Sequence, residues 1–211
     1  NNLDQQRLVA DPRGSLVGWV GENPAGELTL ETYDQESGES RSYPAPGVRP
    51  PDDVLFFAID DRTAYWRTPA GVFAVDLDTG SERPVLEITG DSAHDFEVYS
   101  VEDGVMAFSP SADGNILVGR SVSEAQEVID FRADAAAGPT DPVRLSPTGA
   151  WLSFGVARSE GASEDSITIV GIEPEVYDLA TGEHVTLALP GDPPLAIPSV
   201  WLDDATLIVV G

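Results

Sequence analysis

The amino-acid sequence predicts an all-β protein of the β-propeller class, with about four and a half blades of four antiparallel strands. Three observations lead to this prediction. A turn motif recurs along the chain at a spacing of about 40 residues, which is typical of propellers. The 20 Gly and 17 Pro residues lie in short clusters along the whole length, as expected for tight turns between short strands. With 211 residues, 41% of them hydrophobic, the chain can bury the core of one domain, so we expect a single propeller domain over residues 1–211.

The recurring motif is a run of β-forming residues followed by Asp, two further residues, Ser or Thr, and Gly. Its three copies begin at Asp34, Asp76 and Asp178; the first two are 42 residues apart and the last two 102. The longer step fits two repeats if a polar, exposed loop is inserted at residues 157–166. A degenerate copy without the Asp and Gly then lies at about 118–124, after a strand predicted at 115–120.

Each copy predicts a hairpin, because Gly takes a positive φ and the Asp side chain bonds the backbone of the turn. A second turn motif lies upstream, at Asp11-Pro12-Arg13-Gly14-Ser15 and Ser146-Pro147-Thr148-Gly149-Ala150. Pro sets this turn and Gly closes it, and a strand follows at 16–20 and at 151–155.

Together the two motifs predict the boundaries of the blades. We expect four complete blades and one partial blade, over residues 7–44, 54–89, 95–131, 141–189 and 197–210. The last blade has two strands, and an open sheet edge exposes unpaired backbone groups. We therefore expect either a fragment of a longer propeller, which is the preferred interpretation, or a blade that a neighbouring chain completes.

The pattern Ser-Pro-x-Gly before a strand, then Tyr-Asp-Leu-x-Thr-Gly, resembles the TolB-like and WD-repeat-like propeller modules. Ser146–Gly149 and Tyr177–Gly182 carry it, and the resemblance in architecture extends over residues 7–210. Uncharacterised actinobacterial surface propellers are the most similar of these modules, whereas the Trp-Asp and Gly-His pairs of true WD repeats are absent. The resemblance implies a propeller that binds a protein or peptide at an extracytoplasmic or cell-surface location, although a cytoplasmic one stays open.

The net charge of the chain is −26, from 37 acidic residues against 11 basic ones, all of them arginine. A protein that binds nucleic acid needs clustered positive charge, so we expect no nucleic-acid partner. We interpret the acidity as a contribution to solubility or as a mark of a salt-adapted or high-GC organism, with a cationic partner or divalent ions as the alternative. There is no cysteine and no apolar run of about 18 residues, so we expect no disulfide, no thiolate metal site and no transmembrane segment.

The sequence contains no set of residues typical of catalysis. Gly-x-Ser-x-Gly is absent, and we expect the only two histidines, His94 and His184, to be ordinary exposed loop residues. A propeller glycosidase would need two carboxylates on inner strands; Asp95 and Glu97 are candidates, with Glu97 facing the channel, but no second carboxylate is placed opposite. We therefore predict no catalytic residues.

Several aspartates are candidate metal ligands. None matches a calcium loop, and Asp is a favoured turn residue, so we interpret them as turn residues and predict no metal site and no cofactor. The candidates are Asp91, Asp95, the Asp60–Asp61 and Asp203–Asp204 pairs, and Asp76 with Asp78.

The four tryptophans lie near one place in each blade, where we expect them to pack between blades; a sugar-stacking platform is the alternative. They are Trp19, Trp66, Trp151 and Trp201.

The sequence thus predicts a non-catalytic binding or scaffold module of a propeller protein, with a protein or peptide as its partner. A neighbouring chain that completes its edge is a further candidate partner. The alternatives are a carbohydrate-active propeller enzyme, the propeller half of a serine peptidase, and a purely structural assembly unit.

Overall fold

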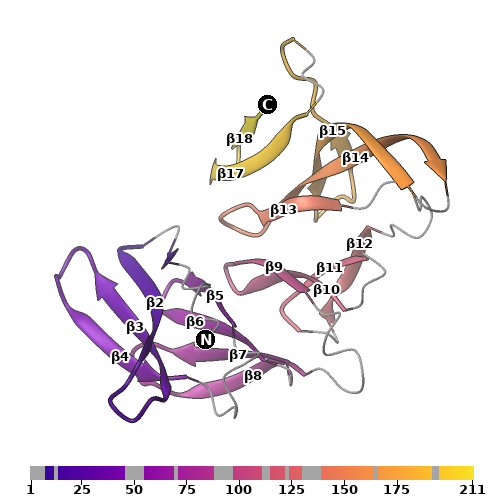
Figure 1. Cartoon of the computed structure of the whole chain (residues 1–211). Helices are drawn as coiled ribbons and strands as arrows, with labels where there is room; N and C mark the ends of the chain where they lie inside the picture. Colours follow the sequence, from indigo (N-terminus) through magenta and orange to yellow (C-terminus); the bar gives the residue numbers. More distant parts are fainter. Residues whose placement is uncertain are drawn as a thin grey trace. The chain divides into compact units, whose positions relative to one another are not determined.

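The structure, a computed structural model, consists of strands joined by turns. It describes residues 8–11, 14–45, 55–68, 71–87, 97–110, 115–121, 124–129, 139–163, 166–191 and 195–211. These residues form four antiparallel sheets of four strands each and one sheet of two strands (Figure 1). The predicted fold class, all-β with about four and a half propeller blades, is confirmed. The described residues contain no helix with the length and apolar character needed to cross a membrane.

The chain divides into two compact units, residues 1–94 and 95–211, which are described separately. The single propeller domain expected over residues 1–211 stays a prediction.

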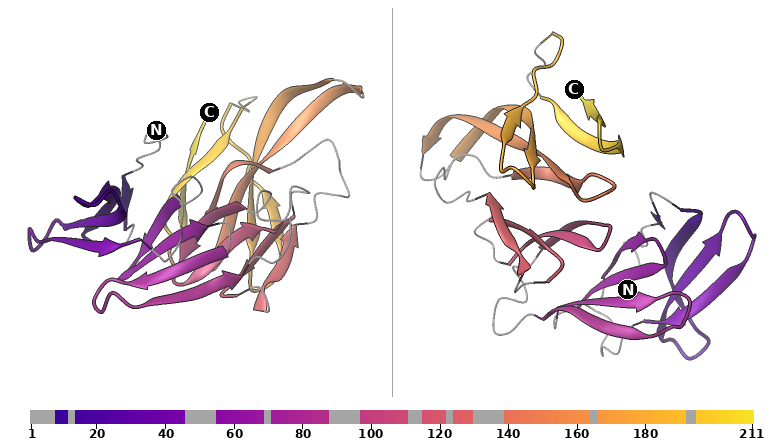
Figure 2. Two further views of the ribbon diagram at one scale, coloured as in Figure 1. Left: turned by 60° about the horizontal axis from the view of Figure 1, so that its bottom comes forward. Right: turned by 180° about the vertical axis from the view of Figure 1, so that it is seen from behind.

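The first unit contains two four-stranded sheets, and in each of them the strands follow one another in chain order (Figures 1 and 2). The first sheet is β1 (Val9–Ala10), β2 (Leu16–Glu22), β3 (Leu28–Asp34) and β4 (Ser40–Pro44); the second is β5 (Leu55–Asp60), β6 (Thr63–Thr68), β7 (Gly71–Asp76) and β8 (Glu82–Glu87).

An apolar core joins these two sheets. Its largest buried members are Trp66, Phe56, Leu30 and Ile59. Gly18 on β2 belongs to the contact, because a Cβ atom at this position would lie 2.9 Å from Ile59 Cδ1 and 3.1 Å from Phe56 Cζ. A side chain at residue 18 would therefore press against the side chains that join the two sheets.

The second unit contains two four-stranded sheets and the two-stranded sheet. The first is β9 (Glu97–Glu102), β10 (Val105–Ser109), β11 (Ile116–Gly119) and β12 (Gln126–Ile129); the next is β13 (Pro139–Leu145), β14 (Trp151–Ser163), β15 (Ser166–Asp178) and β16 (His184–Thr186); the last is β17 (Ile197–Asp203) and β18 (Thr206–Val210).

The first two sheets of this unit also share an apolar core, which contains Ala107 and Ile116 from one sheet and Leu145, Leu152 and Phe154 from the other. Hydrogen bonds reinforce the contact between the first strands of the two sheets. The Leu145 N–H donates to Ser100 Oγ at 3.0 Å, and Arg144 Nη1 donates to the Tyr99 carbonyl at 3.0 Å. In a propeller the first strand of each blade lies innermost, next to the first strand of the neighbouring blade, and these two sheets have that arrangement.

The prediction of an inserted loop at residues 157–166 is wrong. Strands β14 and β15 continue through most of it as a long hairpin, with Arg158 opposite Gly171 and Ser163 opposite Ser166. The returning strand explains the error, because residues 166–170 read Ser-Ile-Thr-Ile-Val, a strongly β-forming segment that pairs with the polar one, with two shifts of register.

The three Asp-Gly turns have the predicted geometry. In each of them the aspartate N–H donates to the carbonyl five residues on at 2.9 Å, and the Gly N–H donates back to the aspartate carbonyl at 2.8 Å. Gly38, Gly80 and Gly182 have φ values of 72°, 70° and 76°. The Asp side chains accept N–H bonds from residues two and three positions on, so the motif closes a hairpin as predicted.

These bonds favour the ionised aspartates. The Ser15 hydroxyl, at 2.6 Å, is the main cause that lowers the pKa of Asp34 from its ordinary value of 3.8 to about 2, and the Glu36 N–H adds to it. Backbone N–H groups, those of Thr79 and Ala180 first, lower the pKa of Asp76 and of Asp178.

The lowered pKa of Asp34 predicts a loss of stability in acid. A carboxylate whose pKa is lower in the folded than in the unfolded chain stabilises the fold above about pH 4 and loses this contribution as the pH falls towards 2. A titration of the Asp34 carboxyl ¹³C shift should give a midpoint near 2, and Asp34→Asn should flatten the decline in unfolding free energy between these pH values. A midpoint at the ordinary value of 3.8 would contradict the assignment.

Gly18→Ala tests the packing of the first two sheets. We expect it to lower the free energy of unfolding by about 1–3 kcal/mol, because the added methyl group overpacks the core, as measured by urea denaturation. The matched control is Gly21→Ala on the same strand, where the nearest atom is Cγ of the flexible Glu31 side chain. Equal effects of the two substitutions would show that the close contact at Gly18 does not matter.

Candidate binding surface

The two-stranded sheet β17–β18 exposes an apolar face. Val200 and Ile208 lie opposite each other in the pair and are 45% and 39% exposed, and Leu202 and Val210 are 61% and 59% exposed. Alternation along the strands places Trp201 and its partner Leu207 on the other face, where both are half-buried. The sheet therefore has two apolar faces, and one of them is uncovered.

Trp201 attaches the covered face to the preceding sheet. Its indole Nε1–H donates to Ser153 Oγ at 3.0 Å and is 3.3 Å from the carbonyl oxygen of Arg144. Ser153 is fully buried, so the bond anchors β17 on β13 and β14. The exposed face thus belongs to a sheet that is held in place from behind.

The turn between β17 and β18 is fixed in the same way. Asp204 accepts a hydrogen bond from Thr148 Oγ1 at 2.7 Å and one from the Thr148 N–H at 3.2 Å. The Thr148 hydroxyl, followed by that of Ser146, lowers the pKa of Asp204. Asp203 accepts the Ala205 N–H at 2.8 Å within the turn. Of the two candidate metal ligands, Asp203 therefore stabilises its own turn and Asp204 stabilises a contact with the preceding sheet.

Strand β18 is a sheet edge. Within the described part of the chain it pairs with β17 alone, whereas every other sheet has four strands. Its sequence, Thr-Leu-Ile-Val-Val, contains no charge and no proline, which are the usual protections of an exposed edge. Sequence reasoning identified the open edge but missed the apolar face, although the alternation of Val200, Leu202, Ile208 and Val210 carried the signal.

The remaining aspartate candidates do not converge. Asp60 is buried, whereas Asp61 is exposed in a turn with φ of +53°. Asp76 bonds its own turn, and Asp78 accepts two hydrogen bonds from Arg62 at 3.0 and 2.6 Å. Among the described residues there is no group of three or more side chains of the types that ligate metals.

Three candidates, Asp91, His94 and Asp95, lie outside the described residues. Glu97 is the exposed first residue of β9.

We expected His184 in a loop. In the structure it is the first residue of β16, opposite Tyr177. It is nearly half exposed, and its Nε2 contacts Glu175 Oε2; the Glu175 side chain is only 12% exposed. The His184 ring also lies 5.5 Å from that of Phe154. Sequence reasoning missed Glu175, although the hairpin places it two residues from the partner of His184 and therefore on the same face.

The tryptophans differ in burial. Trp66 is fully buried in the core between the first two sheets, 5.3 Å from the ring of Phe56, as predicted. The other three are half-buried, and only Trp19 occupies the same place in its blade as Trp66, the middle of the second strand.

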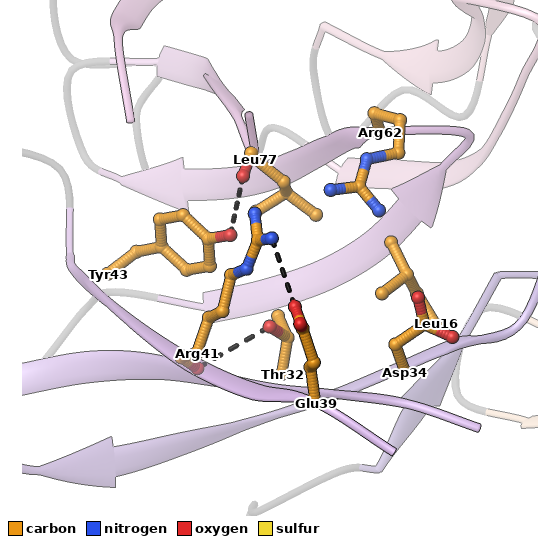
Figure 3. Close-up of a pocket in the computed structure, with 8 residues that line it drawn as sticks. All are labelled: Leu16, Thr32, Asp34, Glu39, Arg41, Tyr43, Arg62 and Leu77. Carbon is orange, nitrogen blue, oxygen red and sulfur yellow. Dashed lines mark hydrogen bonds and ion pairs between the residues drawn. The ribbon is translucent and has the colours of Figure 1, made fainter. Parts of the chain in front are cut away.

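A pocket also lies between the first two sheets, at the ends of their strands (Figure 3). It contains about 270 Å³ of empty space, part of which is open solvent. Tyr43 donates from its hydroxyl to the Leu77 carbonyl at 2.5 Å, and Arg41 pairs with Glu39 at 3.2 Å. The Tyr43 bond joins the two sheets and the Arg41–Glu39 pair lies within the first sheet, so these polar groups are partnered inside the protein.

No family model matches the sequence, and no curated protein does. Solved structures of propeller proteins do match. The chain is similar over 98% of its length to a puromycin-hydrolyzing peptidase of Mycobacterium tuberculosis, with 16% identity and a TM-score of 0.57, and it covers 34% of that chain. It is similar over 84% of its length to a protein assigned as TolB from Agrobacterium tumefaciens, with 14% identity and a TM-score of 0.50, and it covers 62% of that chain.

A third similar structure is an oligogalacturonate lyase from Vibrio parahaemolyticus, with 11% identity, a TM-score of 0.51, and coverage of 90% of this chain and 54% of the lyase. The chain thus spans less than two thirds of each of the three proteins. Similarity at these identities shows the fold, a TolB-like propeller, and the three proteins have different roles.

Trp201→Phe tests the attachment of the β17–β18 sheet. The substitution removes the indole N–H and leaves the buried Ser153 Oγ without this donor, which should lower the free energy of unfolding by about 1–3 kcal/mol. Trp19→Phe, at a half-buried site of the first unit, is the matched control. Equal unfolding midpoints for Trp201→Phe and the unsubstituted protein would contradict the anchoring role.

Proposed function

We propose that the chain is a non-catalytic binding module of a propeller protein, and that it contacts a protein or peptide through the β17–β18 sheet. The observation that carries the proposal is the uncovered apolar face of Val200, Leu202, Ile208 and Val210. Apolar side chains gathered on a sheet face are typical of an interaction surface. Trp201 and Asp204 hold this face from behind, so a partner would meet a preformed surface.

The charge of −26 supports a protein partner over a nucleic acid, which the chain would repel. We place the module outside the cytoplasm, as expected from the resemblance to actinobacterial surface propellers; the similarity to TolB adds weak support through the fold alone.

A random peptide library displayed on phage, selected on the immobilised protein, tests the proposal. We expect enriched peptides that bind reversibly and lose about tenfold in affinity with Val200→Ser, because an apolar contact is removed. Val170→Ser is the control, since Val170 is similarly exposed but lies on β15. A library that yields no binder, or binders indifferent to Val200, would refute the proposal.

A second candidate is the propeller part of a larger hydrolase. It is favoured by the similarity to the peptidase and the lyase, of which the chain spans 34% and 54%. The complete reading frame of the gene tests it: a Gly-x-Ser-x-Gly motif in flanking sequence would support a serine peptidase. A complete frame without that motif would exclude this peptidase form.

A further inference from the structure

We propose that the pocket between the first two sheets binds a small zwitterion, an amino acid with a short apolar side chain. The inference goes beyond the proposed function, because the pocket lies in the first unit and the β17–β18 sheet belongs to the second. It follows from the charged side chains that line the pocket, from the hydrogen-bonding capacity that they leave unused, and from the two leucines beside them (Figure 3).

Two arginines from different sheets line the pocket. Arg41 lies on β4 of the first sheet, and Arg62 lies in the turn between β5 and β6 of the second. Figure 3 shows both guanidinium groups directed into the same space. A planar guanidinium can hold a carboxylate through two parallel N–H bonds, so the pocket has donors for the anionic end of a ligand.

The partners of these arginines leave room for a further acceptor. Arg62 donates from Nε and Nη2 to a single oxygen, Asp78 Oδ1, at 3.0 and 2.6 Å, and its Nη1 makes no hydrogen bond with the described residues. Arg41 donates from Nη2 to Glu39 at 3.2 Å, and the side chains of this pair are 48% and 62% exposed. Exposed ion pairs contribute little to stability, so a ligand carboxylate can compete with Glu39 for Arg41.

Asp34 supplies an acceptor for a cationic group. Its three hydrogen bonds, from the Ser15 hydroxyl and from the N–H groups of Glu36 and Ser37, all reach Oδ1. Its other oxygen, Oδ2, accepts no hydrogen bond from the described residues. These bonds, that of Ser15 first, lower the pKa of Asp34 to about 2, so its carboxylate is ionised at neutral pH. An ammonium group would therefore meet an acceptor that is charged and held in place by its own turn.

The balance of charge around the pocket selects a ligand that carries both signs. Two guanidinium groups, those of Arg41 and Arg62, and two carboxylates, those of Asp34 and Glu39, line the same space. A simple anion would approach the two carboxylates and a simple cation the two guanidinium groups, and like charges at close range repel each other. A molecule with one ammonium and one carboxylate group pairs with both sets.

The remaining lining favours a short apolar side chain on the ligand. Leu16 and Leu77 are both buried and form the apolar part of the pocket. The empty space of about 270 Å³ includes open solvent, so the enclosed part is smaller than this volume. Glycine, alanine and valine therefore match the pocket in charge and in size.

Titration of ¹⁵N-labelled protein with L-alanine, followed by NMR, tests the inference. We expect saturable shifts in the millimolar range at amides around the pocket, those of Arg62 and Leu77 among them. Two analogues are matched controls, because N-acetyl-L-alanine lacks the ammonium group and L-alaninamide lacks the carboxylate. Each should bind at least about tenfold more weakly, since each loses one hydrogen-bonded charge pair.

Substitutions in the protein test the same contacts from the other side. Arg62→Gln should weaken binding of L-alanine at least about tenfold, because it removes a charged donor. Arg41→Gln should have an effect of the same direction, and it replaces the first variant if the loss of the bonds to Asp78 prevents Arg62→Gln from folding. Arg83→Gln is the matched control, because Arg83 is exposed on β8 outside the pocket, and binding should stay unchanged.

Three outcomes would overturn the inference. Absence of saturable shifts in the millimolar range for glycine, L-alanine and L-valine would show that the pocket binds no small amino acid. Equal binding of L-alanine and either analogue would remove the charge argument, and saturable shifts confined to the second unit would remove the pocket. Peptide binding that depends on Val200 would leave the proposed function standing after any of these results.

Discussion

Within each of the two units, the structure depends on the packing of neighbouring sheets against each other. A sheet with an apolar face is stable when another element buries that face, so neighbouring sheets of a unit pack face to face. Between the first two sheets this requires Gly18, whose missing side chain admits Ile59 and Phe56. Between later sheets it is reinforced by bonds from Leu145 to Ser100 and from Trp201 to Ser153.

The same requirement gives the β17–β18 sheet its character. Its covered face is anchored through Trp201, and its other face repeats the apolar alternation that neighbouring sheets bury. Such a face is stable in water only at a cost, and its edge strand β18 carries no charge or proline that would discourage pairing. Among the described residues this sheet has two strands, whereas each of the other sheets has four.

Much of the fold could be predicted from the sequence because its turns are encoded locally. The Asp34, Asp76 and Asp178 turns form from side-chain bonds within a few residues, and their Gly residues need a positive φ. The extension of β14 as far as Ser163 was missed because this polar segment becomes a strand by pairing with the β-forming residues of β15. The contact between Thr148 and Asp204 joins side chains that are 56 residues apart, so turn motifs alone could not reveal it. The contact between His184 and Glu175 was missed because we expected His184 to lie in a loop.

The most direct test of the account is amide hydrogen exchange of the free, monomeric protein, measured residue by residue by NMR. The account predicts that alternate amides of residues 206–210 exchange rapidly, because they face outwards from an unpaired edge, while the amides of the buried strand β6 exchange slowly. Uniform protection of all β18 amides in the monomer would show that the edge is already covered and would contradict the account.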